Sequence, residues 1–331
     1  MSKKYLFLAI IVLIAGAGFL TVSRTFQHAA PPRPLLIGIL ARGASYTPGV
    51  EGFRKKMKEL GYEEGKNVRY DVTFFEKKED LPPVISRLLK EHVDLIHTYS
   101  TPPTVEAYRQ TKTVPIVFGS MGDPLLSKTI QSIQSSGTNV TGVNSLSSPL
   151  AAKRLEFLVE AVPSIRKVAI PFTSDDIAGR SSYNTALDIA QKLKINLVPY
   201  YISPERPARD TAKAILRKDV DAIMISSDAA VWANLDAYVA QAKKEKLPFA
   251  VFDKDMVVKG GLLGYGPDYA VTGAQAAVLA DKILHGEKPT DLPIETPGRF
   301  ILAVNLNTAA DIGIRLPNTF LEKADLIIQS K

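Results

Sequence analysis

From residue 35 onward the chain alternates short apolar runs with longer stretches in which apolar residues recur at helical spacing. Most of the short runs are unbroken rather than alternating, as expected for strands that helices cover on both faces. The order of the two patterns predicts repeated β-α-β units around parallel sheets. We expect strands at residues 35–40, 68–74, 95–99, 116–118, 140–143, 168–172, 197–201, 222–225, 249–252 and 261–264.

The amphipathic stretches between these runs predict helices. Two of them are followed by a glycine, Gly61 and Gly286, where helices often end in left-handed backbone. We expect helices at residues 49–60, 81–91, 151–162, 183–193, 211–218, 229–246 and 271–284.

The strand pattern divides the chain into two similar halves. Five expected strands precede Leu146 and five follow Pro163, and a stretch that contains serine and glycine, residues 142–148, joins them. A chain of 331 residues also exceeds what one hydrophobic core usually supports. We therefore predict the α/β class, with two doubly wound parallel-sheet lobes joined by a hinge.

The N-terminus has the features of an export signal. Lys3 and Lys4 precede an apolar run, residues 5–22, and a proline-rich stretch, residues 31–34, follows. The length of the run and the Pro31 that follows Ala30 leave two alternatives open for residues 1–32, a cleaved signal peptide and an uncleaved membrane anchor. The lysines before the run place the body of the protein outside the cytoplasm, in the periplasm or at the cell surface.

Composition narrows the class of function. The chain has no cysteine, which removes disulfides, thiolate metal sites and a lipid-bearing cysteine together. The net charge of +7 comes from basic residues interleaved with acids, so we do not expect nucleic-acid binding. Phosphate-binding, nucleophile-elbow and zinc motifs are absent from the sequence, and we expect no catalysis, no cofactor and no metal.

The residues just after the strands are the candidate site, because open α/β sheets bind ligands beyond the carboxyl ends of their strands. Serine, threonine and proline at these places are also ordinary helix starts, and aspartate before proline is a common turn, so a structural role stays open for each. The candidate ligand-binding residues are Ser45, Tyr46, Ser100, Thr101, Ser120, Asp123, Asn144, Ser174, Asp228, Trp232, Asp253 and Tyr265.

Several stretches resemble one family in their order and spacing. The chain is similar, over residues 35–317, to the ABC transporter substrate-binding proteins of the tryptophan/tyrosine-type importer group. These have the type I periplasmic-binding-protein fold. The stretches that carry the resemblance are residues 52–67, 114–118, 123–124, 139–143, 227–228, 246–249, 286–289, 305–310 and 312–313.

The resemblance implies a monomeric binding protein that closes on a small molecule and docks on an ABC permease. The implied lobes are residues 35–145 plus 266–288 and residues 146–265 plus 289–331. By matching motif, Thr101, Asp123 and Asp228 fall in the cleft of the family. Relatives often have an asparagine after the first strand of the second lobe, but this chain has Asp175, Asp176, Arg180 and Ser181 there.

We therefore predict capture of an amino acid or a similar small polar metabolite. The carboxylate of the ligand would meet the helix starts after Ser45 and Thr101, and its ammonium would meet Asp123 or Asp228. Tyr46, Trp232 or Tyr265 would pack on its side chain. Two alternatives remain open: a sensor domain that hands its ligand to a signalling partner, and a carboxylate-dependent enzyme.

Overall fold

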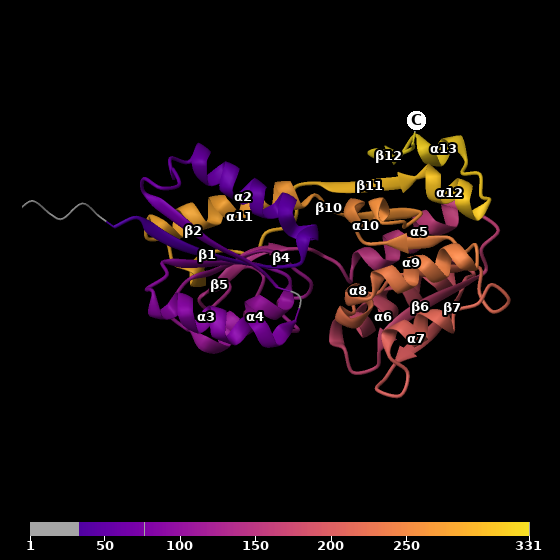
Figure 1. The fold of residues 1–331 in the computed structure, drawn as a ribbon, viewed down its shortest axis with the longest axis horizontal. Coiled ribbons are helices and arrows are strands. Elements are labelled where there is room, and N and C mark those ends of the chain that lie inside the picture. The colour runs from indigo at the N-terminus through magenta and orange to yellow at the C-terminus, as the bar shows by residue number, and fades with distance from the viewer. Residues whose placement is uncertain (1–32, 76, 331) are drawn as a thin grey trace, which may run out of the picture.

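The computed structural model describes residues 33–75 and 77–330, so the predicted signal or anchor at residues 1–32 lies outside the described residues. The chain forms two α/β lobes that lie side by side (Figure 1). Within the described ranges, no helix is both long and apolar enough to cross a bilayer.

The first lobe is built on a five-stranded parallel sheet with the order β2-β1-β3-β4-β5. All five strands predicted before Leu146 are present, and β4 runs three residues beyond its predicted end at Phe118. The strands are β1 (Leu35–Arg42), β2 (Val68–Phe75), β3 (Leu95–Tyr99), β4 (Ile116–Met121) and β5 (Val140–Asn144).

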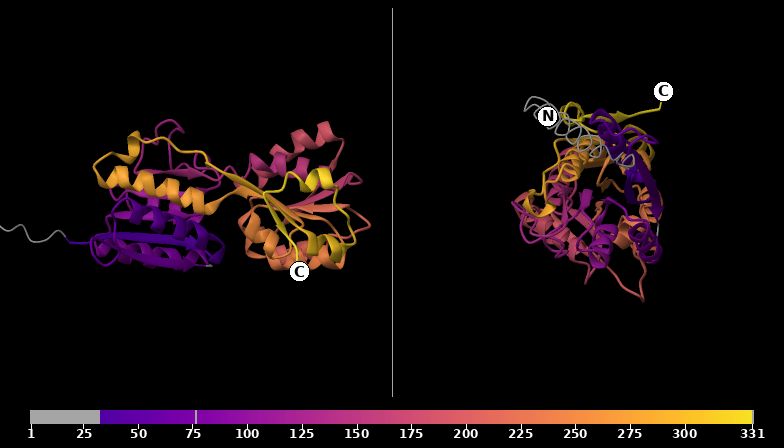
Figure 2. Two further views of the ribbon diagram at one scale, coloured as in Figure 1. Left: turned by 90° about the horizontal axis from the view of Figure 1, so that it is seen from above. Right: turned by 90° about the vertical axis from the view of Figure 1, so that its left-hand side faces the viewer.

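Helices cover both faces of this sheet, which explains why most of its strands are mainly apolar; the edge strand β2, which contains Arg69 and Asp71, is the exception. Helices α2 (Thr47–Glu59) and α11 (Tyr269–Leu284) lie over one face, and α3 (Leu81–Lys90) and α4 (Thr101–Gln110) lie over the other (Figures 1 and 2). Glycines bring α2 and α11 into backbone contact. A Cβ on Gly273 would lie 2.1 Å from the carbonyl oxygen of Gly49, so this position has no room for a side chain.

The second lobe has a seven-stranded sheet with the order β12-β11-β10-β9-β8-β6-β7. Its strands are parallel except that β10 and β11 pair antiparallel. The sequence predicted the first five strands of this lobe and omitted β11 and β12. The strands are β6 (Lys167–Thr173), β7 (Asn196–Ile202), β8 (Ala222–Met224), β9 (Phe249–Val251), β10 (Leu263–Pro267), β11 (Phe300–Asn305) and β12 (Leu326–Ile328).

The helices of the second lobe agree with the prediction only in part: α6 starts six residues before the predicted 183, α7 ends at Lys213 rather than 218, and α10, α12 and α13 were not predicted. The single helix expected at residues 229–246 is two helices, because Asn234 leaves helical geometry and its side-chain amide donates to the carbonyl oxygen of Ala230 over 2.8 Å. The helices are α5 (Leu150–Ala161), α6 (Ile177–Leu193), α7 (Ala208–Lys213), α8 (Ala229–Ala233), α9 (Leu235–Lys244), α10 (Lys254–Val258), α12 (Leu306–Ile312) and α13 (Asn318–Leu321). The short 3₁₀ helices are η1 (Ala44–Tyr46), η2 (Lys78–Asp80) and η3 (Pro289–Asp291).

The chain passes between the lobes three times: from β5 to α5, from β10 to α11, and on the way into β11 (Figure 2). Before the third passage, residues 289–295 bond to the first lobe. Ile294 N donates to Ile133 O over 2.8 Å, and Glu295 N donates to Gly142 O over 2.9 Å. We therefore propose that the chain returns to the second lobe after Glu295, rather than at 289 as expected from the resemblance.

Candidate ligand-binding cavity

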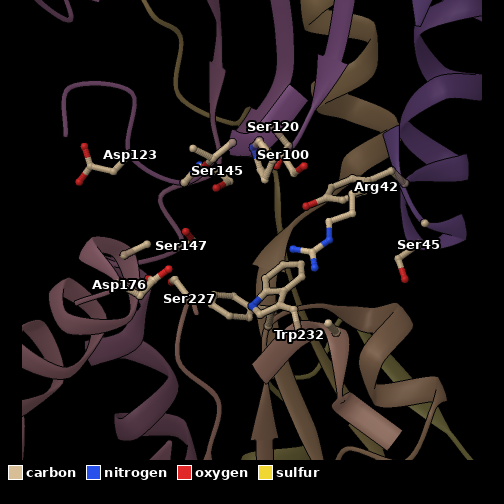
Figure 3. Close-up of a pocket in the computed structure, with 18 of the residues that line it drawn as sticks. Arg42, Ser45, Ser100, Ser120, Asp123, Ser145, Ser147, Asp176, Ser227 and Trp232 are labelled. Carbon is tan, nitrogen blue, oxygen red and sulfur yellow. The ribbon is translucent and has the colours of Figure 1, made fainter. Parts of the chain in front are cut away.

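A cavity of about 1080 Å³ lies between the lobes, at the carboxyl ends of the first-lobe strands. Figure 3 shows side chains from both lobes around it. Seven of the twelve residues predicted for the site line this cavity: Ser45, Tyr46, Ser100, Thr101, Ser120, Asp123 and Trp232.

The first-lobe side of the cavity is made by the segments that follow β1, β3 and β4. Helix α4 begins at Thr101 with proline in its first turn and with no side-chain hydrogen bond to its first N–H groups. Ser100, just before it, has φ 83°, an unfavourable conformation for a residue with a side chain. Because Pro102 and Pro103 have no N–H, the first turn offers the N–H groups of Thr101 and Thr104, and together with the helix dipole these favour a negatively charged group.

Four aromatic rings form two pairs in the lining of the cavity. Tyr46 and Tyr269 have ring centroids 4.9 Å apart, and Trp232 and Phe252 have centroids 4.6 Å apart. The Trp232 indole N–H donates to Ser226 O over 3.2 Å, which fixes the ring that α8 contributes. Rings held in this way offer a rigid apolar surface for the body of a ligand.

The two tyrosines keep their protons at neutral pH. Burial raises the pKa of Tyr46 above its ordinary value, and nearby Asp253 raises it further. Burial also raises the pKa of Tyr269. Their hydroxyl groups are therefore neutral, and they can donate a hydrogen bond as well as accept one.

Acidic and basic side chains both line the cavity. Figure 3 shows Asp123 and Asp176 on one side of the cavity, and Arg42 and Ser45 on the other. Asp123 Oδ1 accepts from Leu126 N over 3.1 Å, and Asp176 caps α6 by accepting from Gly179 N over 2.7 Å. Burial raises the pKa of Asp176. Asp175 and Asp236 also line the cavity, and Asp236 pairs with Arg209 over 2.7 Å, so Asp123, Asp175 and Asp176 are the acids placed to receive a cationic group.

Lys259 brings the second lobe to the basic side of the cavity. Its ammonium donates to Ser45 Oγ over 3.0 Å, so a side chain that follows α10 contacts η1 across the two lobes. Both residues line the cavity.

Two predicted acids of the second lobe do not line the cavity. Asp228 is 1% exposed, and its carboxylate accepts from the backbone N–H groups of Thr173, Ala230 and Val231 over 2.8, 2.6 and 3.2 Å. Asp253 is 2% exposed and caps α10 by accepting from Met256 N over 2.9 Å. Both carboxylates turn into the start of their own helix rather than toward a ligand.

Three further predicted residues also lie outside the lining. Asn144 Oδ1 accepts from Leu146 N over 2.9 Å and so shapes the first connection between the lobes. Tyr265 packs edge-on against Phe157, with centroids 5.0 Å apart. Ser174 is exposed in the loop after β6.

Several lining residues were missing from the predicted set. Phe252 ends an apolar run and therefore looked like part of a strand core. Arg42 and Tyr269 lie directly at strand ends, so the rule that selected the other residues, applied to every strand end, would have included them. The lining residues missing from the prediction include Arg42, Ser145, Ser147, Asp176, Ser227, Phe252, Lys259 and Tyr269.

In residues 33–75 and 77–330, no three His, Asp or Glu side chains gather in a group that could hold a metal ion. His97, the histidine nearest a strand end, is a core residue. Its ring stacks on Phe53 at 4.0 Å, its Nδ1 lies 2.7 Å from Val117 O, and burial lowers its pKa to about 3.

Comparison with known proteins identifies similar sequences and folds. The profile of the family described as ABC transporter substrate binding protein matches residues 37–328. A tyrosine-binding protein from Clostridioides difficile (strain R20291) is 26% identical over 277 residues, which cover 82% of this chain and 79% of that protein.

Two solved structures with similar folds share about a fifth of their residues with this chain. The ABC domain of a Streptococcus pneumonia protein in complex with L-Trp has a TM-score of 0.81 at 21% identity, and the match covers 89% of this chain and 100% of that one. The ligand-free, open structure of a substrate-binding protein with adhesive properties from Clostridium difficile has a TM-score of 0.70 at 22% identity. That match covers 90% of this chain and 100% of the other.

Proposed function

Because the chain belongs to the ABC transporter substrate-binding protein family, we propose that it captures an amino acid, or a similar small zwitterion, in the cavity between its lobes. The observation that carries this proposal is the combination of groups that line one cavity: a helix start without a side-chain cap, four acids and four aromatic rings. The names of the relatives support it, since one is a tyrosine-binding protein and one was solved with L-Trp.

We propose the following placement of the ligand. Its carboxylate lies at the start of α4, where Ser100 and Thr101 line the cavity and the helix dipole favours a negative charge. Its ammonium pairs with Asp123 or Asp176. Asp228 was also predicted from the sequence as an ammonium partner. Its carboxylate accepts hydrogen bonds from three backbone N–H groups, so we do not propose it for that role.

The side chain of the ligand then meets the aromatic rings. Trp232 and Tyr46 belong to different lobes, so a ligand that packs on both is contacted fully only when the lobes come together. A ligand that binds one arrangement of the lobes better than another shifts the protein toward that arrangement. We propose closure of the lobes on the ligand for this reason.

The role in the cell follows from the family. We propose that the protein works outside the cytoplasm as a monomer, hands its solute to an ABC permease for import, and catalyses no reaction. The family consists of binding components of transporters.

A thermal-unfolding screen of the purified protein tests the proposal. Tyrosine, tryptophan, the other amino acids, sugars and nucleosides are added one at a time, and the midpoint of unfolding is measured. A ligand at one hundred times its Kd adds about 2.7 kcal/mol to the unfolding free energy. We expect the largest shift with an amino acid. A shift only with sugars or nucleosides, or conversion of a bound compound to product, would contradict the proposal.

A further inference from the structure

Arg154 is an unusual residue in the core of the second lobe. It lies one turn into α5, its side chain is 0% exposed, and it is among the largest fully buried side chains of the described residues. Arginine is almost never fully buried unless a negative charge pairs with it. Its position directly after the first connection between the lobes suggests a role there.

The guanidinium bonds to one connection between the lobes and lies at the limit of hydrogen-bond distance from the strand that leads into another. Its Nη2 donates to Ser147 O over 2.7 Å, in the connection from β5 to α5. Its Nη1 lies 3.5 Å from Tyr265 O, near the end of β10, where the second connection begins. One planar group therefore ties together two chain segments that are 118 residues apart (147 and 265).

The same guanidinium lies against the cavity lining from behind. Its Cζ is 4.0 Å from the centroid of the Phe252 ring, a distance at which a cation is attracted to an aromatic face. Phe252 lines the cavity and packs on Trp232. Arg154 itself is not part of the lining, so a ligand on these rings would contact Arg154 only through Phe252.

This arrangement is costly for the fold. Among the described residues, no carboxylate lies within 4.0 Å of Arg154, and its Nε has no hydrogen-bond partner. Burial lowers the pKa of Arg154 to about 9, although Tyr269 and Asp253 oppose the shift. Replacement of a buried charge by an apolar residue of similar volume is often neutral or stabilising, so stability does not explain this residue.

The connection that Arg154 contacts is held in an unfavourable conformation. Leu146 has φ 53°, in the left-handed region, and its N–H donates to the side chain of Asn144. Such a conformation persists only where the surrounding bonds fix it. The bond from Arg154 to the neighbouring Ser147 O is one of those bonds.

We infer that Arg154 is a positioning residue that links the first and second connections to the aromatic lining at Phe252, and so sets the relative orientation of the lobes. A ligand that packs on Phe252 and Trp232 would then be coupled to the connections through this side chain. The expected effect of Arg154 on affinity rests on the proposed function, whereas the expected effect of Arg154 on lobe orientation can be measured without a ligand.

The distance between the lobes in the free protein tests the first part. Because the chain has no cysteine, the substitutions Lys58→Cys in α2 and Asp188→Cys in α6 introduce two unique sites for spin labels on exposed positions of the two lobes. Pulsed electron resonance then gives the distribution of distances between the lobes. We expect Arg154→Met to broaden or shift this distribution, whereas the same distribution as in the parent protein would overturn the inference.

Two further variants make this result specific. Arg166 also donates to backbone carbonyl groups, Pro163 O and Ile165 O, but lies on the surface away from the connections, so Arg166→Met should leave the distribution unchanged. If Arg154→Met does not fold, Arg154→Lys keeps the charge but loses the planar group that reaches both carbonyl oxygens. It should broaden the distribution too, and an unchanged distribution in that variant overturns the inference equally.

Affinity tests the second part, with L-tyrosine and L-tryptophan as probes. For Arg154→Met we expect binding about tenfold weaker while the unfolding midpoint of the free protein stays the same or rises. A residue that only stabilised the fold would instead lower the midpoint and leave affinity intact. If the parent protein binds no amino acid, the proposed function fails, but the distance measurement still decides on the role of Arg154.

Discussion

Three helices of the first lobe and four of the second begin in different ways, and the difference affects which strand-end residues can reach a ligand. In the first lobe, α2, α3 and α4 start with proline in the first turn and no side-chain cap. In the second lobe, α6, α8, α10 and α12 start with the side chains of Asp176, Asp228, Asp253 and Asn305 bonded to their own N–H groups.

The difference has a direct effect on the cavity. Six predicted residues of the first lobe line the cavity, and none of their side chains caps a helix, although Asp123 and Ser45 bond elsewhere in the protein. Where a buried carboxylate caps the helix, its oxygen accepts a hydrogen bond from a backbone N–H of that helix, as at Asp228 and Asp253. Asp176 caps α6 and still lines the cavity, so a capping acid is removed from the ligand candidates only when it is also buried, as Asp228 and Asp253 are.

The largest expected effect is a loss of stability at a capping acid. In Asp228→Asn one carboxylate oxygen becomes an NH₂ group, which cannot accept, so at least one buried backbone N–H loses its partner. Hydrogen bonds to charged groups contribute about 1.5–3 kcal/mol each. We expect the free energy of unfolding, measured with urea, to fall by about 3 kcal/mol. Affinity of the folded variant for an amino acid should change by less than about threefold, because Asp228 does not line the cavity. A tenfold change would correspond to about 1.4 kcal/mol. A large loss of affinity at unchanged stability would remove the distinction between the lobes.

Replacement of the second capping acid, Asp253, should raise the free energy of unfolding rather than lower it. Asp253 Oδ2 has no hydrogen-bond partner, whereas both carboxylate oxygens of Asp228 accept hydrogen bonds. Burial raises the pKa of Asp253 to about 6, against about 3.9 in the unfolded chain. The folded state thus binds this proton more tightly, and the cost of the buried charge is absent below about pH 4, grows through pH 4 to 6 and is complete above that range.

We therefore predict that Asp253→Asn is more stable than the parent protein at pH 7, by about 2 kcal/mol, because asparagine can still cap α10 without a charge. The difference should disappear near pH 4. Urea unfolding at pH 4, 5, 6 and 7 measures it. A variant that is less stable at pH 7 would show that the ionised carboxylate is well solvated in the folded protein.

The acids that line the cavity should affect binding rather than stability. In Asp123→Asn or Asp176→Asn the shape is kept and the charge is lost, so the variant at the ammonium site should bind an amino acid about tenfold to one-hundredfold more weakly. Calorimetric titration measures this effect, and Asp228→Asn serves as the comparison. Full affinity in both cavity variants would mean that the ligand carries no cationic group at this side of the cavity.

The smallest expected effect concerns the backbone at the cavity. Ser100 has φ 83°, which glycine adopts without strain, so Ser100→Gly should change the free energy of unfolding by no more than about 1 kcal/mol, in the stabilising direction. The gain is limited because glycine also adds entropy to the unfolded chain. Thermal unfolding detects the change. A clearly destabilised variant would show that the Ser100 side chain has a structural role.

Much of the fold followed from the sequence. The unbroken apolar runs located all five strands of the first lobe, and both the α/β class with two lobes and the resemblance to the tryptophan/tyrosine-type binding proteins are confirmed. The antiparallel strand β11 was missed, although Phe300–Asn305 is an apolar run of similar length. The break at Asn234 was also missed, since a polar residue within an amphipathic helix is ordinary and only the bond to Ala230 O distinguishes it.

The cavity was harder to predict, for a physical reason. Position along the chain shows that Asp123 and Asp228 both follow strands, but not whether backbone N–H groups engage the carboxylate. Phe252 and the neighbouring residues of its apolar run also suit a core. Their role depends on the approach of the second lobe, which is set by contacts far apart in sequence.

The backbone contact of α2 with α11 also bears on how the protein is made. Helix α11 is synthesised more than 200 residues after α2, yet it covers the same face of the first sheet and buries Ala276, Ala277 and Leu279 there. Chains fold from the N-terminus as they emerge, but this face stays uncovered until residue 284 has appeared. The first lobe therefore cannot mature before most of the second has been made, which gives an exported chain a long interval in an unfinished, translocatable state.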